Sequence, residues 1–378
     1  MQAMSCQATP LASHLPPRRG TVRRVGLALG GAGLALLLAG CGALEPTPAA
    51  AEARSGFARA MGQWVAADGP AALATLAALA PEDLDAPRRA TRACILARFA
   101  PGAARADTVE PGLPAELAAV LRAYKAYWTA SLMHRSDAAQ AEEALRRELA
   151  AAGEGAAPEP TLPAQADAAR ALAGRLGWHA LGGVTPPLQE FMLWRQQTSG
   201  VQTVALPEGP VDVAVTRLDG FASLGWLAYA TCDRHHTGGW ATREGLMVVA
   251  PAWDMASEAY RVSLLAHEAQ HFADYRRFPQ LAATDLEFRA KLVELMLARD
   301  THRDLVEAFA AQASPQRTSA HAFASHQLVT RLRARLGGAA LSTADSTQLR
   351  EAAAAELRAH TQALQARGPA LVQSVLPD

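Results

Sequence analysis

Two histidines that could share a metal ion lie four residues apart in the run His267-Glu268-Ala269-Gln270-His271. On a helix, residues with this spacing lie one above the other on the same face, where two imidazoles can bind one Zn²⁺ ion. Glu268 would lie one step round the helix, close enough to take a proton from a water molecule on the metal. The pattern therefore predicts a zinc site for hydrolysis, with Glu268 as the general base.

This prediction requires a helix at the motif, and the surrounding sequence favours one. Residues 257–278 contain neither glycine nor proline, and Pro279 ends the run. Apolar residues recur at Leu265, Ala269 and Phe272, as the inner face of a half-buried helix requires.

A third ligand is expected from a second helix. Residues 285–295 have an apolar face at helical spacing, formed by Phe288, Leu292 and Leu295. The break at Phe278-Pro279 would fold this helix back against the first one. Glu287 could then complete a three-residue zinc site.

HExxH followed by a glutamate on the next helix resembles the gluzincin branch of the zincin metallopeptidases, over about residues 263–295. The resemblance implies that His267, His271 and Glu287 bind Zn²⁺ and that Glu268 is the general base. It also implies a small sheet before the motif helix, whose edge strand pairs with an extended substrate backbone. Residues 239–242 or 246–250 would be that edge.

The sequence departs from the gluzincin pattern at Lys291, which stands where the family has an aspartate that supports a ligand histidine. Asp285 and Glu294 therefore remain alternatives to Glu287 as the third ligand. The metzincin pattern does not fit, because it needs glycine at position 274 and histidine at position 277, where this chain has an aspartate and an arginine.

Asp274 falls on the same helix face as His267 and His271. One interpretation is that its carboxylate orients a ligand imidazole through the far ring nitrogen. The other is that it is a solvated acid that pairs with Arg276 or Arg277.

Zincins usually place a histidine or tyrosine opposite the metal, where it stabilises the oxyanion of the reaction. His321 is the preferred candidate here and His326 is the alternative, both within the helical run 318–336. Both could instead be exposed helix residues. His179 is interpreted as a core or capping residue, and His235 and His236 as a solvated loop pair.

Composition limits the classes of protein to consider. The chain has 378 residues, 36 basic and 36 acidic side chains, and half of its residues are hydrophobic. This balance is typical of a soluble globular protein with one large or two modest domains. Nothing in the charge points to nucleic acid as a partner.

Residues 1–40 are predicted to be a lipoprotein signal peptide. Four arginines between positions 18 and 24 precede a short apolar run over 25–38. Leu38-Ala39-Gly40-Cys41 resembles the bacterial lipobox, which implies cleavage before Cys41 and a lipid on that cysteine. The lipid would anchor the protein to a membrane of the bacterial cell envelope. Because Gly42 follows, the expected location is the outer membrane, facing the periplasm.

Two cysteines are then left to pair. Cys6 leaves with the signal peptide and Cys41 carries the lipid, so Cys94 and Cys232 remain in an oxidising compartment. A disulfide between these two residues is therefore a hypothesis.

The predicted fold is α+β and mostly helical, with a small antiparallel or mixed sheet before the HExxH helix. A tether over 41–53 leads to a helical region over 54–176, and a zincin-like metal-site domain with C-terminal helices follows over 177–378. In the helical region, one long element over 114–150 carries Tyr124, Tyr127 and Trp128 at helical spacing, which indicates core packing. A helix is expected at 188–196, strands at 201–206, 211–215, 221–231 and 246–250, and helices at 301–313 and 342–364.

Together these features predict a membrane-anchored zinc metallopeptidase that acts on peptides or proteins of the cell envelope. An amidase that acts on cell-wall peptides would share the same site. The alternative from another class is a non-catalytic envelope scaffold, whose helical half binds a partner and whose metal is structural or missing.

Overall fold

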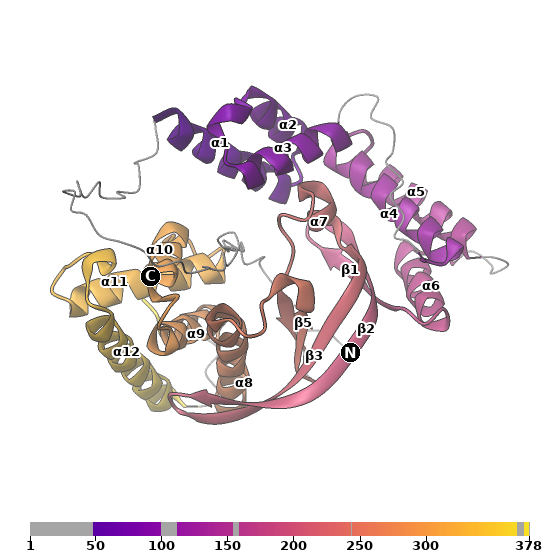
Figure 1. The fold of residues 1–378 in the computed structure, drawn as a ribbon. Coiled ribbons are helices and arrows are strands. Elements are labelled where there is room, and N and C mark those ends of the chain that lie inside the picture. The colour runs from indigo at the N-terminus through magenta and orange to yellow at the C-terminus, as the bar shows by residue number, and fades with distance from the viewer. Residues whose placement is uncertain (1–47, 100–111, 154–158, 243, 369–373, 378) are drawn as a thin grey trace, which may run out of the picture.

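The computed structural model describes residues 48–99, 112–153, 159–242, 244–368 and 374–377 (Figure 1). The predicted signal peptide and Cys41 lie outside these residues. The described chain is mostly helical with one mixed five-stranded sheet, which confirms the α+β fold class. Within the described ranges, no helix has both the length and the apolar character that a bilayer crossing requires.

The N-terminal part is a row of helices that arches over one end of the sheet (Figure 1). They are α1 (Pro48–Val65), α2 (Gly69–Ala78), α3 (Ala86–Phe99), α4 (Ala115–Leu132), α5 (Ala138–Ala152) and α6 (Leu162–Arg175), with a 3₁₀ turn at Pro81–Asp83. Because α1 begins at Pro48 and Ala53 is buried, the prediction of a tether over all of 41–53 is wrong at its C-terminal end.

The single element predicted over 114–150 is two helices, α4 and α5. His134, just after α4, has a positive φ of 51°, which a helix does not allow. The Asp137 side chain then caps α5 by accepting a hydrogen bond from the Gln140 N–H at 2.8 Å.

The aromatic face of α4 packs in the core, as predicted. Tyr124, Tyr127 and Trp128 are buried. The Tyr124 ring stacks on Phe191 of the sheet at 4.6 Å, and Trp128 Nε1 donates a hydrogen bond to the Gln189 carbonyl at 2.8 Å. These contacts join the helical arch to the sheet in one hydrophobic core.

The hypothesis of a disulfide between Cys94 and Cys232 is confirmed. The bond ties α3 to Cys232, the residue directly after α7 (Trp226–Thr231), across 138 residues of chain. It therefore adds a covalent link between the helical arch and the segment that follows the sheet.

The strands lie in the order β1-β2-β3-β5-β4. They are β1 (His179–Thr185), β2 (Leu188–Leu206), β3 (Gly209–Leu224), β4 (Gly239–Ala241) and β5 (Leu246–Val249). All neighbours are antiparallel except β3 and β5. Strand β5 is paired on both sides and β4 lies at an edge, so of the two candidate substrate edges only β4 is free of a second neighbour.

The helix predicted at 188–196 is wrong, because these residues form the first half of β2. Phe191, Met192, Leu193 and Trp194 are consecutive and all buried, between β1 and β3. A continuous apolar run of this length fits a buried helix and a strand buried on both faces equally well. The strand pairing decides between them.

The strand predicted at 221–231 is correct only as far as Leu224. Gly225 has a φ of 96°, and a Cβ atom there would lie 2.2 Å from Glu190 Oε1. The Glu190 carboxylate accepts a hydrogen bond from the Trp226 N–H at 3.0 Å and so caps the short helix α7. Burial raises the pKa of Glu190 to about 7, although hydrogen bonds from the backbone N–H groups of Trp226 and Phe191 favour the ionised carboxylate.

The C-terminal helices pack inside the curve of the β2–β3 hairpin (Figure 1). They are α8 (His267–Arg277), α9 (Ala283–Leu297), α10 (His302–Gln312), α11 (Ala320–Arg335) and α12 (Ser346–Arg367), with a 3₁₀ turn at Leu341–Thr343. The far half of the hairpin, β5 and these helices share a second hydrophobic core. This core holds α8, α9 and α11 together.

Candidate metal centre

Helices α8 and α9 bring two histidines and a glutamate to one point. His267 Nε2 lies 3.5 Å from Glu287 Oε2, and His271 Nε2 lies 3.4 Å from Glu287 Oε1. One possible ligand atom from each residue lies within 4.8 Å of the other two. His267, His271 and Glu287 can therefore hold one metal ion between them.

The packing of α8 on α9 produces this convergence. Ala269 lies between the two histidines in sequence and is fully buried, and Phe288 and Leu292 on α9 belong to the same core. The buried hydrogen bonds between Asp274 of α8 and Arg289 of α9 hold the two helices against each other. Helix α9 then presents Glu287 to the face of α8 that carries His267 and His271.

The segment just before α8 is a π-helix, Tyr260–Ala266, and not the regular helix predicted from residue 257. Turns of this kind are rare and occur frequently at functional sites. Here the π-helix ends at the residue before His267, so the first candidate ligand begins the regular helix.

Glu294 orients His267. The His267 Nδ1 donates a hydrogen bond to Glu294 Oε1 at 2.8 Å, and the two side chains are only 5% and 4% exposed. This bond fixes the imidazole so that Nε2 points to Glu287. Glu294 is thus a supporting residue and not the third ligand, which was one of the open alternatives.

The charges of the group depend on one another. Burial alone would lower the pKa of His267, but hydrogen bonds to Glu287 and Glu294 outweigh it and raise this pKa to about 10. Burial would raise the pKa of Glu287, but the imidazoles of His267, His271 and His321 hold it well below its usual range. The carboxylate is therefore ionised at neutral pH, and a metal ion that binds here would displace the proton of His267, because a histidine binds metal in its neutral form.

The residues fit a metal ion chemically. Two imidazole nitrogens and one carboxylate oxygen are a ligand set typical of catalytic zinc sites. His271 Nδ1 is buried and has no hydrogen-bond partner among the described residues. His271 therefore contacts a carboxylate only through Nε2, whereas His267 is also fixed through Nδ1 by Glu294.

His321 reaches the same point from the first turn of α11. Its Nδ1 lies 2.6 Å from Glu287 Oε2, and its ring stacks with that of His267 at a centroid distance of 6.4 Å. Ser319 caps the helix by accepting a hydrogen bond from the Ala322 N–H, which fixes its first turn. Of the two histidines named as candidates on this helix, only His321 has a contact with the group.

Glu268 follows His267 directly on α8 and is half-buried. Its carboxylate forms no hydrogen bond or ion pair with the described part of the chain. It is therefore available to exchange a proton with a molecule bound beside the metal site.

Asp274 does not orient a ligand imidazole, and the alternative pairing with Arg276 or Arg277 is also wrong. Both carboxylate oxygens accept hydrogen bonds from Arg289 Nε at 2.9 Å, and both residues are buried. Arg289 Nη1 also donates to the Thr361 hydroxyl at 2.7 Å. The sequence did not indicate that α9 would bury an arginine beside Asp274.

Asp285 is excluded as a ligand because it faces α12. Its Oδ1 accepts hydrogen bonds from His360 Nε2 at 2.9 Å and from the Val375 N–H at 3.1 Å. Lys291, at the position of the supporting aspartate in gluzincins, places its ammonium 4.5 Å from the centre of the Phe309 ring. The supporting carboxylate comes instead from Glu294, one turn further along α9.

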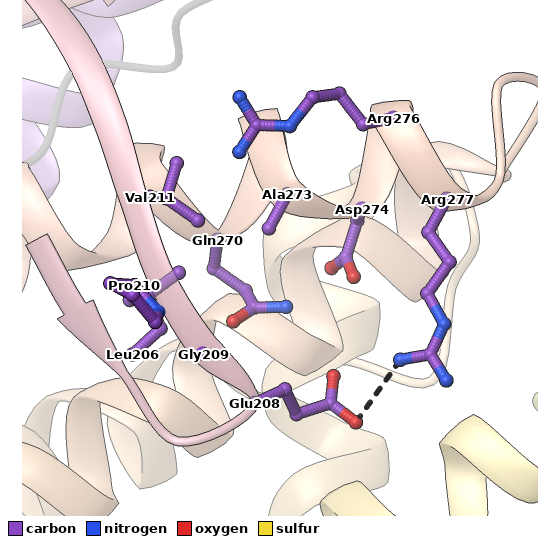
Figure 2. Close-up of a pocket in the computed structure, with 10 residues that line it drawn as sticks. All are labelled: Leu206, Glu208, Gly209, Pro210, Val211, Gln270, Ala273, Asp274, Arg276 and Arg277. Carbon is purple, nitrogen blue, oxygen red and sulfur yellow. Dashed lines mark hydrogen bonds and ion pairs between the residues drawn. The ribbon is translucent and has the colours of Figure 1, made fainter.

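A cavity of about 150 Å³ lies beside α8, between that helix and the β2–β3 turn. Figure 2 shows Gln270 and Asp274 pointing into it from α8, with Glu208 and Arg277 paired across its lower edge. None of the candidate ligands lines this cavity. It lies roughly a quarter turn round the helix from the metal group.

The other histidines singled out in the sequence do not join the group. His179 is exposed and stacks on Trp194 at 5.9 Å, so it is neither a core nor a capping residue. His236 Nδ1 lies 3.0 Å from the Thr237 carbonyl within its own loop.

Comparisons with known proteins leave the site to be interpreted on its own geometry. The chain matches no protein-family model, no curated protein and no solved structure.

Proposed function

We propose that this chain is a zinc-dependent hydrolase, and specifically a metallopeptidase of the gluzincin type. The observation that carries the proposal is the convergence of His267, His271 and Glu287 from two helices, with Glu268 beside them. Along the chain these residues lie within about twenty positions of one another, which does not by itself bring their side chains together. Their meeting at one point is an independent result of the packing of α8 on α9.

Zinc is the proposed metal because of the ligand types. Two imidazoles and one carboxylate suit Zn²⁺, whereas Mg²⁺ and Ca²⁺ prefer oxygen ligands alone. When bound, zinc supplies Lewis acidity, which lowers the pKa of a water molecule and polarises a substrate carbonyl.

Each residue around the metal group would then have its own role in the hydrolysis. Glu268 takes a proton from the attacking water and later gives it to the leaving amine. His321 donates a hydrogen bond to the substrate oxygen on which negative charge develops. Glu294 keeps His267 oriented, and strand β4, at the edge of the sheet, pairs with an extended peptide backbone.

The proposed location is the bacterial cell envelope, with a lipid on Cys41 as the anchor. The disulfide between Cys94 and Cys232 supports this location, because such bonds persist in oxidising compartments. Mass spectrometry of the N-terminal peptide tests it. A lipid-modified Cys41 as the N-terminal residue is expected, and an unmodified N-terminus further upstream would contradict the anchor.

Metal analysis and one substitution test the proposed activity. The purified full chain is expected to contain about one zinc ion per molecule. Glu268→Gln should retain the zinc and lose hydrolysis of peptide substrates by about 10²- to 10⁴-fold. Zinc without hydrolysis in the wild type, on peptides and on cell-wall fragments alike, would favour the scaffold alternative.

His321 can be tested against a control on the same helix. His321→Ala is expected to lower turnover by about 10²-fold with zinc retained, because one oxyanion donor is lost. His326→Ala removes a histidine of the same helix that has no contact with the group, and it should be near wild type. Equal turnover in the two variants would remove His321 from the mechanism.

A further inference from the structure

The 374–377 segment, a short stretch of irregular backbone, lies across helices α9 and α11. On the side of α9, the Val375 N–H donates a hydrogen bond to Asp285 Oδ1 at 3.1 Å. On the side of α11, Gln327 Nε2 donates a hydrogen bond to the Pro377 carbonyl at 3.1 Å. The segment is therefore bonded to both of the helices that meet at the metal group.

These contacts are buried. Asp285 is 0% and Gln327 is 5% exposed, and the Leu376 side chain, at 4%, belongs to the hydrophobic core that α9 and α11 share. A buried carboxylate or amide that loses a hydrogen-bond partner destabilises the fold. The segment supplies partners to two such side chains and one apolar side chain to the core, so it is a fixed part of the structure.

Arg317 fastens the segment to the turn that leads into α11. Its Nη2 donates hydrogen bonds to the Leu376 carbonyl at 2.9 Å and to the Pro377 carbonyl at 3.1 Å. Its guanidinium carbon lies 4.2 Å from the centre of the Phe323 ring, in the first turn of the helix. One side chain therefore ties the segment to the start of α11.

The anchors of the segment lie close in the chain to both partners of the contact between His321 and Glu287. Asp285 stands two residues before Glu287, and Arg317 stands four residues before His321. His321 Nδ1 and Glu287 Oε2 lie 2.6 Å apart. Because both anchors bind the same short segment, the starts of α9 and α11 cannot separate without breaking its hydrogen bonds.

We propose that the 374–377 segment is a positioning element that holds His321 against Glu287. Its effect on turnover rests on the proposed role of His321 as the oxyanion donor, whereas its effect on the contact with Glu287 does not. A misplacement of about 1 Å in a catalytic group can cost about 10²-fold in rate. The segment would thus act on the reaction through α11, without itself taking part in the chemistry.

Turnover by the full chain tests this role. Leu376→Ala removes the side chain that seats the segment and should lower kcat about tenfold, with KM and zinc content unchanged. In the His321→Ala background it should have no further effect on kcat, because the donor that the segment positions is gone. Leu341→Ala is the matched control, since Leu341 is 6% exposed in the same core but follows the opposite end of α11. It should lower the stability and leave kcat at the wild-type value.

Substitutions of Arg317, whose side chain is exposed, repeat the test without opening a cavity in the core. Arg317→Met keeps the apolar stem over Phe323 but loses both hydrogen bonds to the segment, so it should lower kcat as Leu376→Ala does. Arg317→Lys keeps a donor for the two carbonyls and should retain most of the wild-type kcat.

Unfolding of the full chain in urea tests the same contact without measuring activity. Leu376→Ala and His321→Ala should each lower the free energy of unfolding, and the double variant should lower it by less than the sum, because both act on one contact. Additive losses, a kcat loss by Leu376→Ala that persists in the His321→Ala background, or an equal kcat loss in Leu341→Ala would each overturn the proposal. Non-additive losses in a chain that hydrolyses no peptide would support the positioning element and contradict the proposed hydrolase alone.

Discussion

Replacing Glu294 with glutamine should weaken metal binding without removing any ligand. The Glu294 carboxylate accepts the Nδ1–H of His267 and so fixes Nε2 toward the metal position. Glutamine keeps the size of the side chain and one acceptor oxygen but loses the negative charge. The His267 imidazole then becomes a weaker base and is held less firmly.

The expected size of this effect follows from the contact. The two atoms lie 2.8 Å apart, and neither side chain is more than 5% exposed, so solvent does not screen the interaction. A hydrogen bond to a charged, buried group contributes about 1.5 to 3 kcal/mol. Loss of such support typically costs about 10- to 100-fold in metal affinity. The zinc Kd should therefore rise by a factor in this range.

Competition against a fluorescent chelator measures that Kd. Glu356→Gln is the matched control, because Glu356 is also buried and pairs with Arg331 and Arg335, away from the metal group. The control should lose stability but bind zinc as the wild type does. If Glu294→Gln binds zinc within twofold of the wild type, the assignment of Glu294 as the support of His267 is wrong.

Two further predictions concern stability. Asp274→Asn should lower the free energy of unfolding, measured by urea denaturation, by about 3 kcal/mol, because it leaves the charge of the buried Arg289 partly uncompensated. The zinc affinity should stay unchanged. A loss of zinc affinity would instead return Asp274 to the metal site. Glu190 has a pKa of about 7 in the folded chain, against an ordinary 4.5, so the folded chain keeps this carboxyl protonated to a higher pH than the unfolded chain does. The stability that the protonated carboxyl contributes below pH 4.5 is therefore lost as the pH rises from about 4.5 to 7. The loss amounts to about 3 kcal/mol, and Glu190→Gln, which keeps an acceptor for the Trp226 N–H, should remove this pH dependence; equal pH slopes in the two proteins would contradict the burial argument.

The local signals in the sequence predicted the helices of the metal site well. The run without glycine or proline around the motif, and the apolar spacing of Phe288 and Leu292, identified α8 and α9. They also narrowed the third ligand to three acids on one helix. The choice among those acids depends on how α9 is rotated against α8 and α12, which tertiary packing sets.

Other features depend on partners that are distant in the chain. Asp274 is neutralised by Arg289 from another helix, which spacing along α8 could not reveal. The residues of β2 form a strand because β1 and β3 flank them, although their apolar run suits a helix too. One signal was available: Glu294 lies seven residues after Glu287, so it shares a face with it and could have been proposed as a support.

The most direct test of the central claim is the position of a zinc ion, located by anomalous diffraction at the zinc edge from crystals of the zinc-loaded full chain. We predict one ion about 2.0 to 2.2 Å from His267 Nε2, His271 Nε2 and a Glu287 oxygen. Crystals with no ion at these residues after loading with zinc, or with the ion at other side chains, would contradict it.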